Sequence, residues 1–373
     1  MLIRNAVVFA EDAFHRDLQV RVSDGLVRET GPSLLPLPGE EILDLEGDWL
    51  LPGFVDVHIH AFRGHDTMHG EADVRAMARD LRREGVAVFC PTTMSASAAD
   101  TAQAVAGARQ VRLHPDPEGA RVAGVHMEAP FLSEKKAGAQ LPVHFRDPSM
   151  ELFETMTGGH PEDVRLITLA PEKSGSEAFI RQATALGVHV SVGHTVANAE
   201  QVHLAGDWGA DHVTHTFNAQ TPLNHREPGV PGAGLTDDRF YAEMICDGIH
   251  LHRDTVRLIW KAKGAGKAVV ITDAMEAAGM PDGEYALGGQ RVIVRDGEAR
   301  LTDGTLAGSV LRMPQALRNL ILRFGIPAED AVRMCTATPA DSIGEKLAGR
   351  ILPGSPAPLT RWRPDWTFVS PIG

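Results

Sequence analysis

Short apolar segments rich in β-branched residues recur eight times between residues 54 and 274, and this repetition constrains the fold more than any other feature of the chain. The segments lack polar alternation, and stretches of helical period fill several gaps between them. Such strands separated by amphipathic helices indicate a parallel sheet buried on both faces. Eight of them in roughly 220 residues are the number and span of a (β/α)8, TIM-type barrel. The strand-like segments are 54–60, 86–93, 121–128, 164–172, 188–195, 211–218, 240–248 and 268–274, and the clearest helical segments are 71–85, 97–111, 176–187 and 254–266.

An open, doubly wound sheet is the alternative architecture. It is disfavoured because no GxGxxG motif follows the early strands and because polar residues end many strands rather than gathering at one switch point. Two long excursions, 129–163 after the third strand and 275–308 after the eighth, interrupt the alternation, and barrel enzymes build substrate pockets from such insertions. The second excursion contains a predicted hairpin over 285–301.

The two ends of the chain differ from this pattern. Residues 1–50 contain short strand-like segments with turns and no helical period, and the tail from 346 to 373 returns to Pro/Gly turns and short apolar runs. We therefore expect one small accessory β-sandwich domain built from both termini, 1–50 and 346–373, beside a barrel domain of residues 51–345.

Charge and cysteine content exclude several classes of function. The formal net charge of −13 argues against a nucleic-acid or anionic-membrane surface, although a local basic pocket could still bind a small anion. Three cysteines without CxxC spacing fit a reducing compartment better than a disulfide framework. No segment has a signal-peptide core or bilayer-spanning length, so we expect a cytoplasmic protein.

Ligand-type side chains stand at the ends of five of the predicted strands. In a barrel these side chains emerge at one rim and converge, and imidazole with carboxylate suits zinc, iron, manganese or cobalt in a catalytic site. A metal there lowers the pKa of water toward 7 and favours attack on a carbonyl, with one carboxylate left to move a proton. A solvated acid or a packed histidine is the ordinary alternative for each residue alone; their common position favours a metal hydrolase. The ligand-type residues at these five strand ends are His58, His60, Glu128, His194, His215 and Asp273.

Polar residues on the loops after the sixth and seventh strands are candidates for binding substrate. Asn218, His225 and Arg226 follow the sixth strand, and His250 follows the seventh. Arg226 and His250 could bind a phosphate or carboxylate. For Arg226, a surface ion pair with Glu227 is about equally compatible with the chemistry.

Several motifs together resemble a known family. "LPGFVDVHIHA" resembles the first-strand signature of the amidohydrolase superfamily, which is built on this barrel with a small β domain. "GVHMEAPFLSEKKAGAQ", "VSVGHT", "THTFNAQTPLNHREPG", "CDGIHL", "VITDAM" and "LTDGTLAGS" resemble, more narrowly, N-acetylglucosamine-6-phosphate deacetylases, and the likeness runs from about residue 1 to 355. The resemblance implies hydrolysis of the acetamide of N-acetyl-D-glucosamine 6-phosphate to D-glucosamine 6-phosphate and acetate, in amino-sugar catabolism or cell-wall recycling.

The resemblance also implies roles for individual residues. Glu128, His194 and His215 would hold the main divalent metal, and His58 and His60 a second ion bridged by Glu128, so one or two ions per subunit are expected. Asp273 would act as general base and then acid. A homodimer is implied, since part of the phosphate pocket would come from a neighbouring subunit. The substrate would be bound by Asn218, Ala219, Arg226 and His250, with backbone contacts from Ala139 and Leu306.

The chain departs from the family pattern in three places. Ala129 replaces a common glycine, Gln140 stands where many members have a carbonyl-polarising histidine, and the tail lacks the usual ending. Two other functions stay open: another amidohydrolase, such as a cyclic amidase or deaminase, and a non-catalytic barrel that binds amino-sugar phosphates. The absence of a lysine at any strand end argues against the cyclic amidase, and the presence of Asp273 argues against the non-catalytic barrel.

Overall fold

A computed structural model describes all 373 residues, and its centre is a barrel of eight parallel strands. Each strand is hydrogen-bonded in parallel to the next along the chain. The ring is completed where the eighth strand meets the first: the Asp273 amide donates to the His58 carbonyl at 2.9 Å, and the His60 amide donates to the Ala274 carbonyl at 3.0 Å. The barrel strands are β8 (Phe54–Ile59), β11 (Val86–Thr93), β13 (Val125–Met127), β14 (Val164–Leu169), β15 (His189–Val192), β16 (His212–Val213), β17 (Tyr241–Ile245) and β18 (Ala268–Ile271), with β12 (Arg121–Val122) extending β13 along β11.

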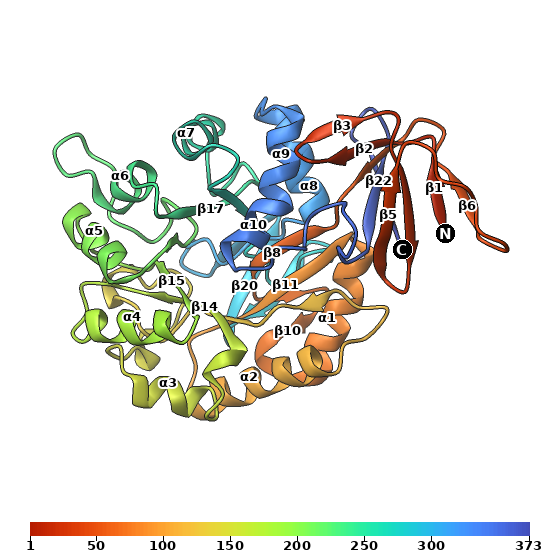
Figure 1. Cartoon of the computed structure of the whole chain (residues 1–373). Helices are drawn as coiled ribbons and strands as arrows, with labels where there is room; N and C mark the ends of the chain where they lie inside the picture. Colours follow the sequence, from red (N-terminus) through yellow and green to blue (C-terminus); the bar gives the residue numbers. More distant parts are fainter.

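Helices surround this barrel (Figure 1). In α1, the buried residues Val74, Met77, Ala78 and Leu81 repeat at the helical spacing and face the strands. The N-terminus of α5 is fixed by a capping box, in which Asn198 and Gln201 each bond the other's backbone amide. The helices are α1 (Glu71–Arg83), α2 (Ala98–Leu113), α3 (Met150–Met156), α4 (Ser176–Ala185), α5 (Ala199–Trp208), α6 (Gly229–Thr236), α7 (Arg253–Lys263), α8 (Met313–Arg318), α9 (Ala328–Cys335) and α10 (Ala337–Ser342).

Two further sheets, built from both termini, lie beside the barrel, and Figure 1 shows the two chain ends together there. The C-terminal strands pair with one another and with β7, which directly precedes the first barrel strand. The predicted barrel with accessory β structure from both termini is thereby confirmed. One sheet has the order β5 (Leu26–Gly31), β4 (Gln19–Ser23), β1 (Leu2–Arg4), β6 (Ile42–Asp44), and the other β23 (Phe368–Ile372), β22 (Leu359–Trp362), β7 (Trp49–Leu51), β2 (Val7–Ala10), β3 (Ala13–His15).

The two excursions fold over the carboxyl ends of the strands. The predicted hairpin is part of a three-stranded antiparallel sheet, which packs on Met94 and Met275 through its own small apolar cluster. The Gln290 side chain donates to the Ala139 carbonyl at 2.6 Å and so ties this sheet to the other excursion. The sheet consists of β19 (Gly283–Leu287), β20 (Gln290–Arg295) and β21 (Glu298–Leu301), and the other excursion contains the short helices η2 (Glu134–Lys136), η3 (Pro142–His144) and η4 (Pro161–Asp163) as well as α3.

Two expectations about the chain as a whole can be compared with the structure. Cys90, Cys246 and Cys335 are buried and form no disulfide. None of the helices combines the length and apolar character needed to cross a bilayer.

Candidate active site

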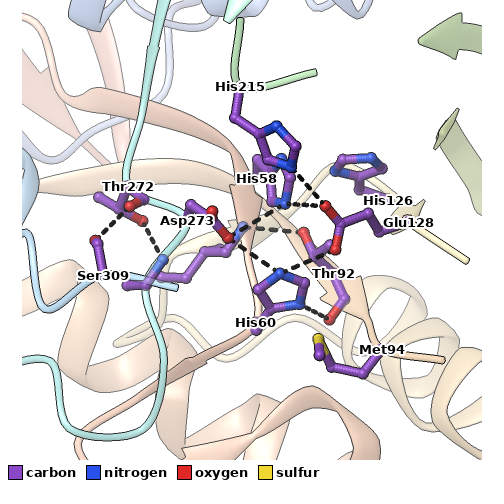
Figure 2. Close-up of polar contacts among 12 residues, drawn as sticks. His58, His60, Thr92, Met94, His126, Glu128, His215, Thr272, Asp273 and Ser309 are labelled. Atoms are coloured by element: carbon purple, nitrogen blue, oxygen red, sulfur yellow. Dashed lines mark hydrogen bonds and ion pairs between the residues drawn. The ribbon is translucent and has the colours of Figure 1, made fainter. Parts of the chain in front are cut away.

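Two triads of buried ligand-type side chains lie at the carboxyl ends of the barrel strands. In each triad, one nitrogen or oxygen from every residue lies within 4.8 Å of the others. The structure thus brings together all six residues that the strand ends suggested, and Figure 2 shows five of them around one space. The first triad is His58, His60 and Asp273, and the second is Glu128, His194 and His215.

The Glu128 carboxylate lies between the triads and contacts both. Its Oε1 is 3.1 Å from Nε2 of His194 and 3.2 Å from Nε2 of His215. The same oxygen is 3.4 Å from Nε2 of His58, while Oε2 is 3.3 Å from Nε2 of His60. On the opposite side, Oδ1 of Asp273 is 3.1 Å from His60 Nε2 and 3.5 Å from His58 Nε2. The four Nε2 atoms therefore converge on one small volume bounded by two carboxylates.

Three of the six residues have a left-handed backbone. The φ angles of His194, His215 and Asp273 are 46°, 28° and 49°. Residues other than glycine are uncommon there, and each costs on the order of 1–3 kcal/mol that the surrounding structure must compensate. Strained residues gather at functional sites more than elsewhere, so the backbone supports the same location as the side chains.

A glycine allows the strands to approach closely beside this site. A Cβ built on Gly193, which precedes His194, would lie 2.6 Å from Cβ of Thr214 and 2.8 Å from Cγ2 of Thr168. Any larger residue would push β15 away from its neighbours and would displace the His194 ring with it.

Hydrogen bonds donated by Nδ1 orient three of the four imidazoles. His194 donates to the Lys136 carbonyl at 2.8 Å, and His60 donates to the Thr92 carbonyl at 3.3 Å. His58 donates to the carboxylate of Glu243 at 3.1 Å. A proton on Nδ1 leaves the lone pair of Nε2 free, which is the atom that each ring directs into the site.

The charges in the site favour a bound cation. Burial alone lowers the pKa of His60, but its hydrogen bonds to Asp273 and Glu128 raise that pKa to about 9. Burial likewise raises the pKa of Glu128, yet the nearby His58 and His194 hold it well below its usual value. Neither triad contains Arg or Lys, so protonated imidazoles balance the negative charge of the buried carboxylates. A divalent metal ion would supply that positive charge instead.

One atom in particular fits a metal ligand. Nε2 of His58 is buried and has no hydrogen-bond partner, although it lies between Glu128 and Asp273. Buried polar atoms are nearly always paired, so an unpaired one at the centre of a ligand cluster points to an ion. Imidazole nitrogens with carboxylate oxygens are suitable donors for zinc, iron or manganese.

A cavity of about 350 Å³ opens above the triads. Five of the six triad residues line its base; His58 lies beneath the surface with 0% exposure. Most of the residues that we expected to contact substrate also line it: Ala139, Gln140, Asn218, Ala219, His250 and Leu306.

Two of the predicted substrate-binding residues, His225 and Arg226, do not line this cavity, and both are exposed. Arg226 lines a separate surface depression with Asn198 and Thr221, and so does not reach the cavity of its own chain. It also forms no ion pair with Glu227, although both residues line that depression.

Gln140 is directed toward a carboxylate. Its side-chain nitrogen donates to Oε2 of Glu128, and its oxygen accepts the Ser95 amide at 2.7 Å. His250 is held in the cavity wall by Asp247, to which Nδ1 donates at 2.7 Å. Burial lowers the pKa of His250, but Asp247 outweighs this and raises it.

Sequence reasoning missed two cations at the cavity. Lys135 and Lys136 line it, and the nearby carboxylates of Glu134 and Asp147 pair with Lys173 instead. They fall in an irregular excursion, where no periodicity indicates which side chains face inward. The other lining residues that were missed are Met94, Ala137, Gly138, Leu287, Thr305 and Gly308.

A parallel eight-stranded barrel with histidine and carboxylate triads at its carboxyl rim defines a hydrolase of the amidohydrolase type. The sequence profile described as "Amidohydrolase family" matches residues 49–373, and the chain belongs to this family.

Relatives within the family indicate a narrower class of enzyme. An N-acetylglucosamine-6-phosphate deacetylase of Lysinibacillus sphaericus is 36% identical over 95% of this chain and 91% of the relative. An N-acetylgalactosamine-6-phosphate deacetylase of Escherichia coli O157:H7 is 34% identical over 95% of this chain and 93% of the relative. The chain is thus similar to N-acetylhexosamine-6-phosphate deacetylases over nearly its whole length.

Solved structures agree with these similarities. The N-acetylglucosamine-6-phosphate deacetylase of Thermotoga maritima has a TM-score of 0.89 and 33% identity, covering 100% of this chain and 98% of that one. A variant of the Mycobacterium smegmatis N-acetyl-D-glucosamine-6-phosphate deacetylase was solved in complex with N-acetyl-D-glucosamine-6-phosphate. It has a TM-score of 0.91 and 32% identity, covering 100% of this chain and 97% of that one.

Proposed function

We propose that the protein hydrolyses the acetamide of N-acetyl-D-glucosamine 6-phosphate and releases D-glucosamine 6-phosphate and acetate. The observation that carries this proposal is the pair of buried triads joined by Glu128 at the base of a cavity. Similarity of 36% over 95% of the chain to an N-acetylglucosamine-6-phosphate deacetylase supports the substrate class.

We infer that the triads hold one or two divalent ions, zinc, iron, manganese or cobalt. Glu128, His194 and His215 would hold the main ion, while His58 and His60 would hold the second, with Glu128 shared between them. A divalent ion there would supply Lewis-acid polarisation of the acetamide carbonyl and a lowered pKa for a water nucleophile. The six donor residues, the unpaired Nε2 of His58 and the excess of carboxylate charge support this assignment.

Asp273 is the residue suited to proton transfer. Its Oδ1 faces the space between the triads, and its backbone is fixed by donation from its own amide to the His58 carbonyl and from the Ser309 amide to its carbonyl. The carboxylate would take a proton from water as the new C–O bond forms. It would then give that proton to the amine nitrogen as the C–N bond breaks, so that acetate and a free amine leave.

The cavity wall is suited to binding a phosphorylated sugar. Its volume lies within the range of small-molecule sites, about 300–1,000 Å³. Asn218, Ala219 and His250, with the backbone at Ala139 and Leu306, would position the sugar. Lys135 and Lys136, which no carboxylate of this chain pairs with, would bind the phosphate, since charge-assisted hydrogen bonds to phosphate are among the strongest in proteins.

We further infer a homodimer in which the partner's Arg226 completes the phosphate site. Within one chain Arg226 is exposed, lies outside the cavity and has no carboxylate partner. Its exposed position suits a contact with a second copy of the chain.

N-acetylgalactosamine 6-phosphate is a second candidate substrate. The relative that acts on N-acetylgalactosamine 6-phosphate matches this chain at 34% identity, close to the 36% of the N-acetylglucosamine-6-phosphate enzymes. A cyclic amidase is disfavoured because no lysine belongs to either triad.

Acetate release from four compounds would test the proposal: the 6-phosphates of N-acetylglucosamine and N-acetylgalactosamine, and the two unphosphorylated sugars. We expect N-acetylglucosamine 6-phosphate to be the best substrate, with kcat/KM reduced by at least a hundredfold when the phosphate is absent. Preference for N-acetylgalactosamine 6-phosphate would reassign the substrate. No acetate from any of the four with metal-loaded protein would refute the deacetylase function.

A further inference from the structure

A carboxylate that belongs to neither triad is buried inside the barrel. Glu243 is the third residue of β17, and its side chain has 0% exposure. Barrel interiors are normally filled by branched apolar residues. A carboxylate that is removed from water is destabilising unless specific partners compensate for the lost hydration.

The partners of Glu243 are one histidine from each triad. Its Oε2 accepts Nδ1–H of His58 at 3.1 Å and the backbone amide of His215 at 3.2 Å. The backbone carbonyl of Glu243 accepts the Thr216 amide at 2.9 Å. Oε1 has no hydrogen-bond partner. A single side chain thus connects β17 both to the first barrel strand and to the end of the sixth.

His58 differs from the other three triad histidines in the group that accepts a hydrogen bond from its Nδ1. His60 and His194 donate to neutral backbone carbonyls, and Nδ1 of His215 has no partner. Among the four triad histidines, only His58 donates from Nδ1 to a carboxylate. A carboxylate on the far nitrogen of a metal-binding histidine fixes the ring, selects the tautomer and makes the near nitrogen a stronger donor.

We propose that Glu243 is a positioning residue for the ion that His58 would hold. Glu243 keeps the His58 ring oriented so that the unpaired Nε2 faces Glu128 and Asp273, and its negative charge strengthens that nitrogen as a ligand. This inference rests on the metal centre of the proposed function. It assigns control of the His58 side of that centre to a residue that touches neither the cavity nor the substrate.

Two substitutions of Glu243 separate its charge from its shape. Glu243→Gln retains an oxygen that can accept from His58 but removes the charge, whereas Glu243→Leu removes the acceptor. We expect wild-type protein, stripped by chelation and titrated with Co²⁺ or Zn²⁺, to bind two ions per chain. The weaker of the two should lose roughly tenfold in affinity in Glu243→Gln and a hundredfold or more in Glu243→Leu, as outer-shell partners commonly contribute 10–100-fold.

Two comparisons exclude a merely structural effect. Thr168→Val is the matched control, because Thr168 is equally buried in the barrel but bonds His126 and Thr214 instead of a triad residue. It should bind both ions with wild-type affinity. In a His58→Ala background, Glu243→Gln should cause no further loss of affinity for the remaining ion, since Glu243 acts through His58.

Three results would overturn the proposal. Wild-type affinity in Glu243→Gln would show that the charge has no role, and this variant decides the matter even where Glu243→Leu fails to fold. A further tenfold loss in the His58→Ala background would show a general structural role. Wild-type protein that binds no ion would overturn the metal centre itself, a failure recognised before any variant is made.

Discussion

Replacing Asp273 with asparagine should abolish turnover while leaving the metal centre in place. The φ angle of Asp273 is 49°, a left-handed conformation that asparagine tolerates and alanine adopts at a cost of about 1–2 kcal/mol. Asparagine also keeps the size of the side chain and the backbone bonds to His58 and Ser309. The substitution therefore removes the proton acceptor, whose Oδ1 lies 3.1 Å from His60, with little change in shape.

The expected fall in kcat follows from the role of the carboxylate in proton transfer. General acid–base catalysis contributes typically 10²–10⁴-fold, so kcat should fall by that factor, or about 2.7–5.5 kcal/mol of activation free energy. KM and bound metal should change little. Acetate release and metal content would be measured on the same sample, with Asp24→Asn as the control, because Asp24 has a φ of 50° but lies on the exposed turn after β4. Activity of Asp273→Asn within tenfold of wild type, at equal metal content, would refute its role as base.

Three further predictions concern the triads, the phosphate site and the barrel. Joint substitution of His58 and His60 by alanine should lower the metal content by one ion per chain, and an unchanged count in mass spectrometry would show that the pair binds none. Lys135→Met and Lys136→Met should each raise KM for the 6-phosphate about tenfold, the equivalent of one charge-assisted bond of about 1.4 kcal/mol; equal losses on the unphosphorylated sugar would contradict phosphate binding. Gly193→Ala should destabilise the protein by about 1–3 kcal/mol, because its Cβ would lie 2.6 Å from a side chain of the next strand. Urea unfolding within 0.5 kcal/mol of wild type would contradict that overpacking.

The triads could be located from the sequence because of a property of parallel strands. Their carboxyl ends meet at one rim, so residues as distant along the chain as His58 and Asp273 must approach one another once the barrel closes. The convergence of Glu128 with His194 follows from the same geometry. No other information about tertiary structure was needed for this part of the site.

The cavity wall could be predicted only in part. Leu287 ends the first strand of the three-stranded sheet, Thr305 follows that sheet in a loop, and Lys135 lies in an irregular segment, so periodicity could not indicate which side chains face inward. Arg226 was placed at the substrate because it is a cation near the sixth strand. In the structure Arg226 instead lines a separate surface depression and not the cavity of its own chain. Loop direction depends on tertiary packing that sequence patterns do not encode.

The sequence around Glu243 could have predicted that this residue has a buried partner. It is a charged residue inside the apolar segment 240–248, which predicts a fully buried strand. A carboxylate in such a strand needs a buried partner, and the histidines at the neighbouring strand ends were the available candidates. Because Glu243 lies inside this segment and not at its end, it did not fall among the predicted ligand positions, and only the structure shows its bond to His58.

The dependence of acetate release on metal tests the central claim most directly. Protein stripped by chelation would be titrated with Zn²⁺ or Co²⁺ while acetate release from N-acetylglucosamine 6-phosphate is followed. We predict no turnover without metal and recovery that is complete at one to two ions per chain, in step with the metal bound to the protein. Full turnover by metal-free protein would contradict the account, because the triads of His58, His60 and Asp273 and of Glu128, His194 and His215 would then have no ion to hold.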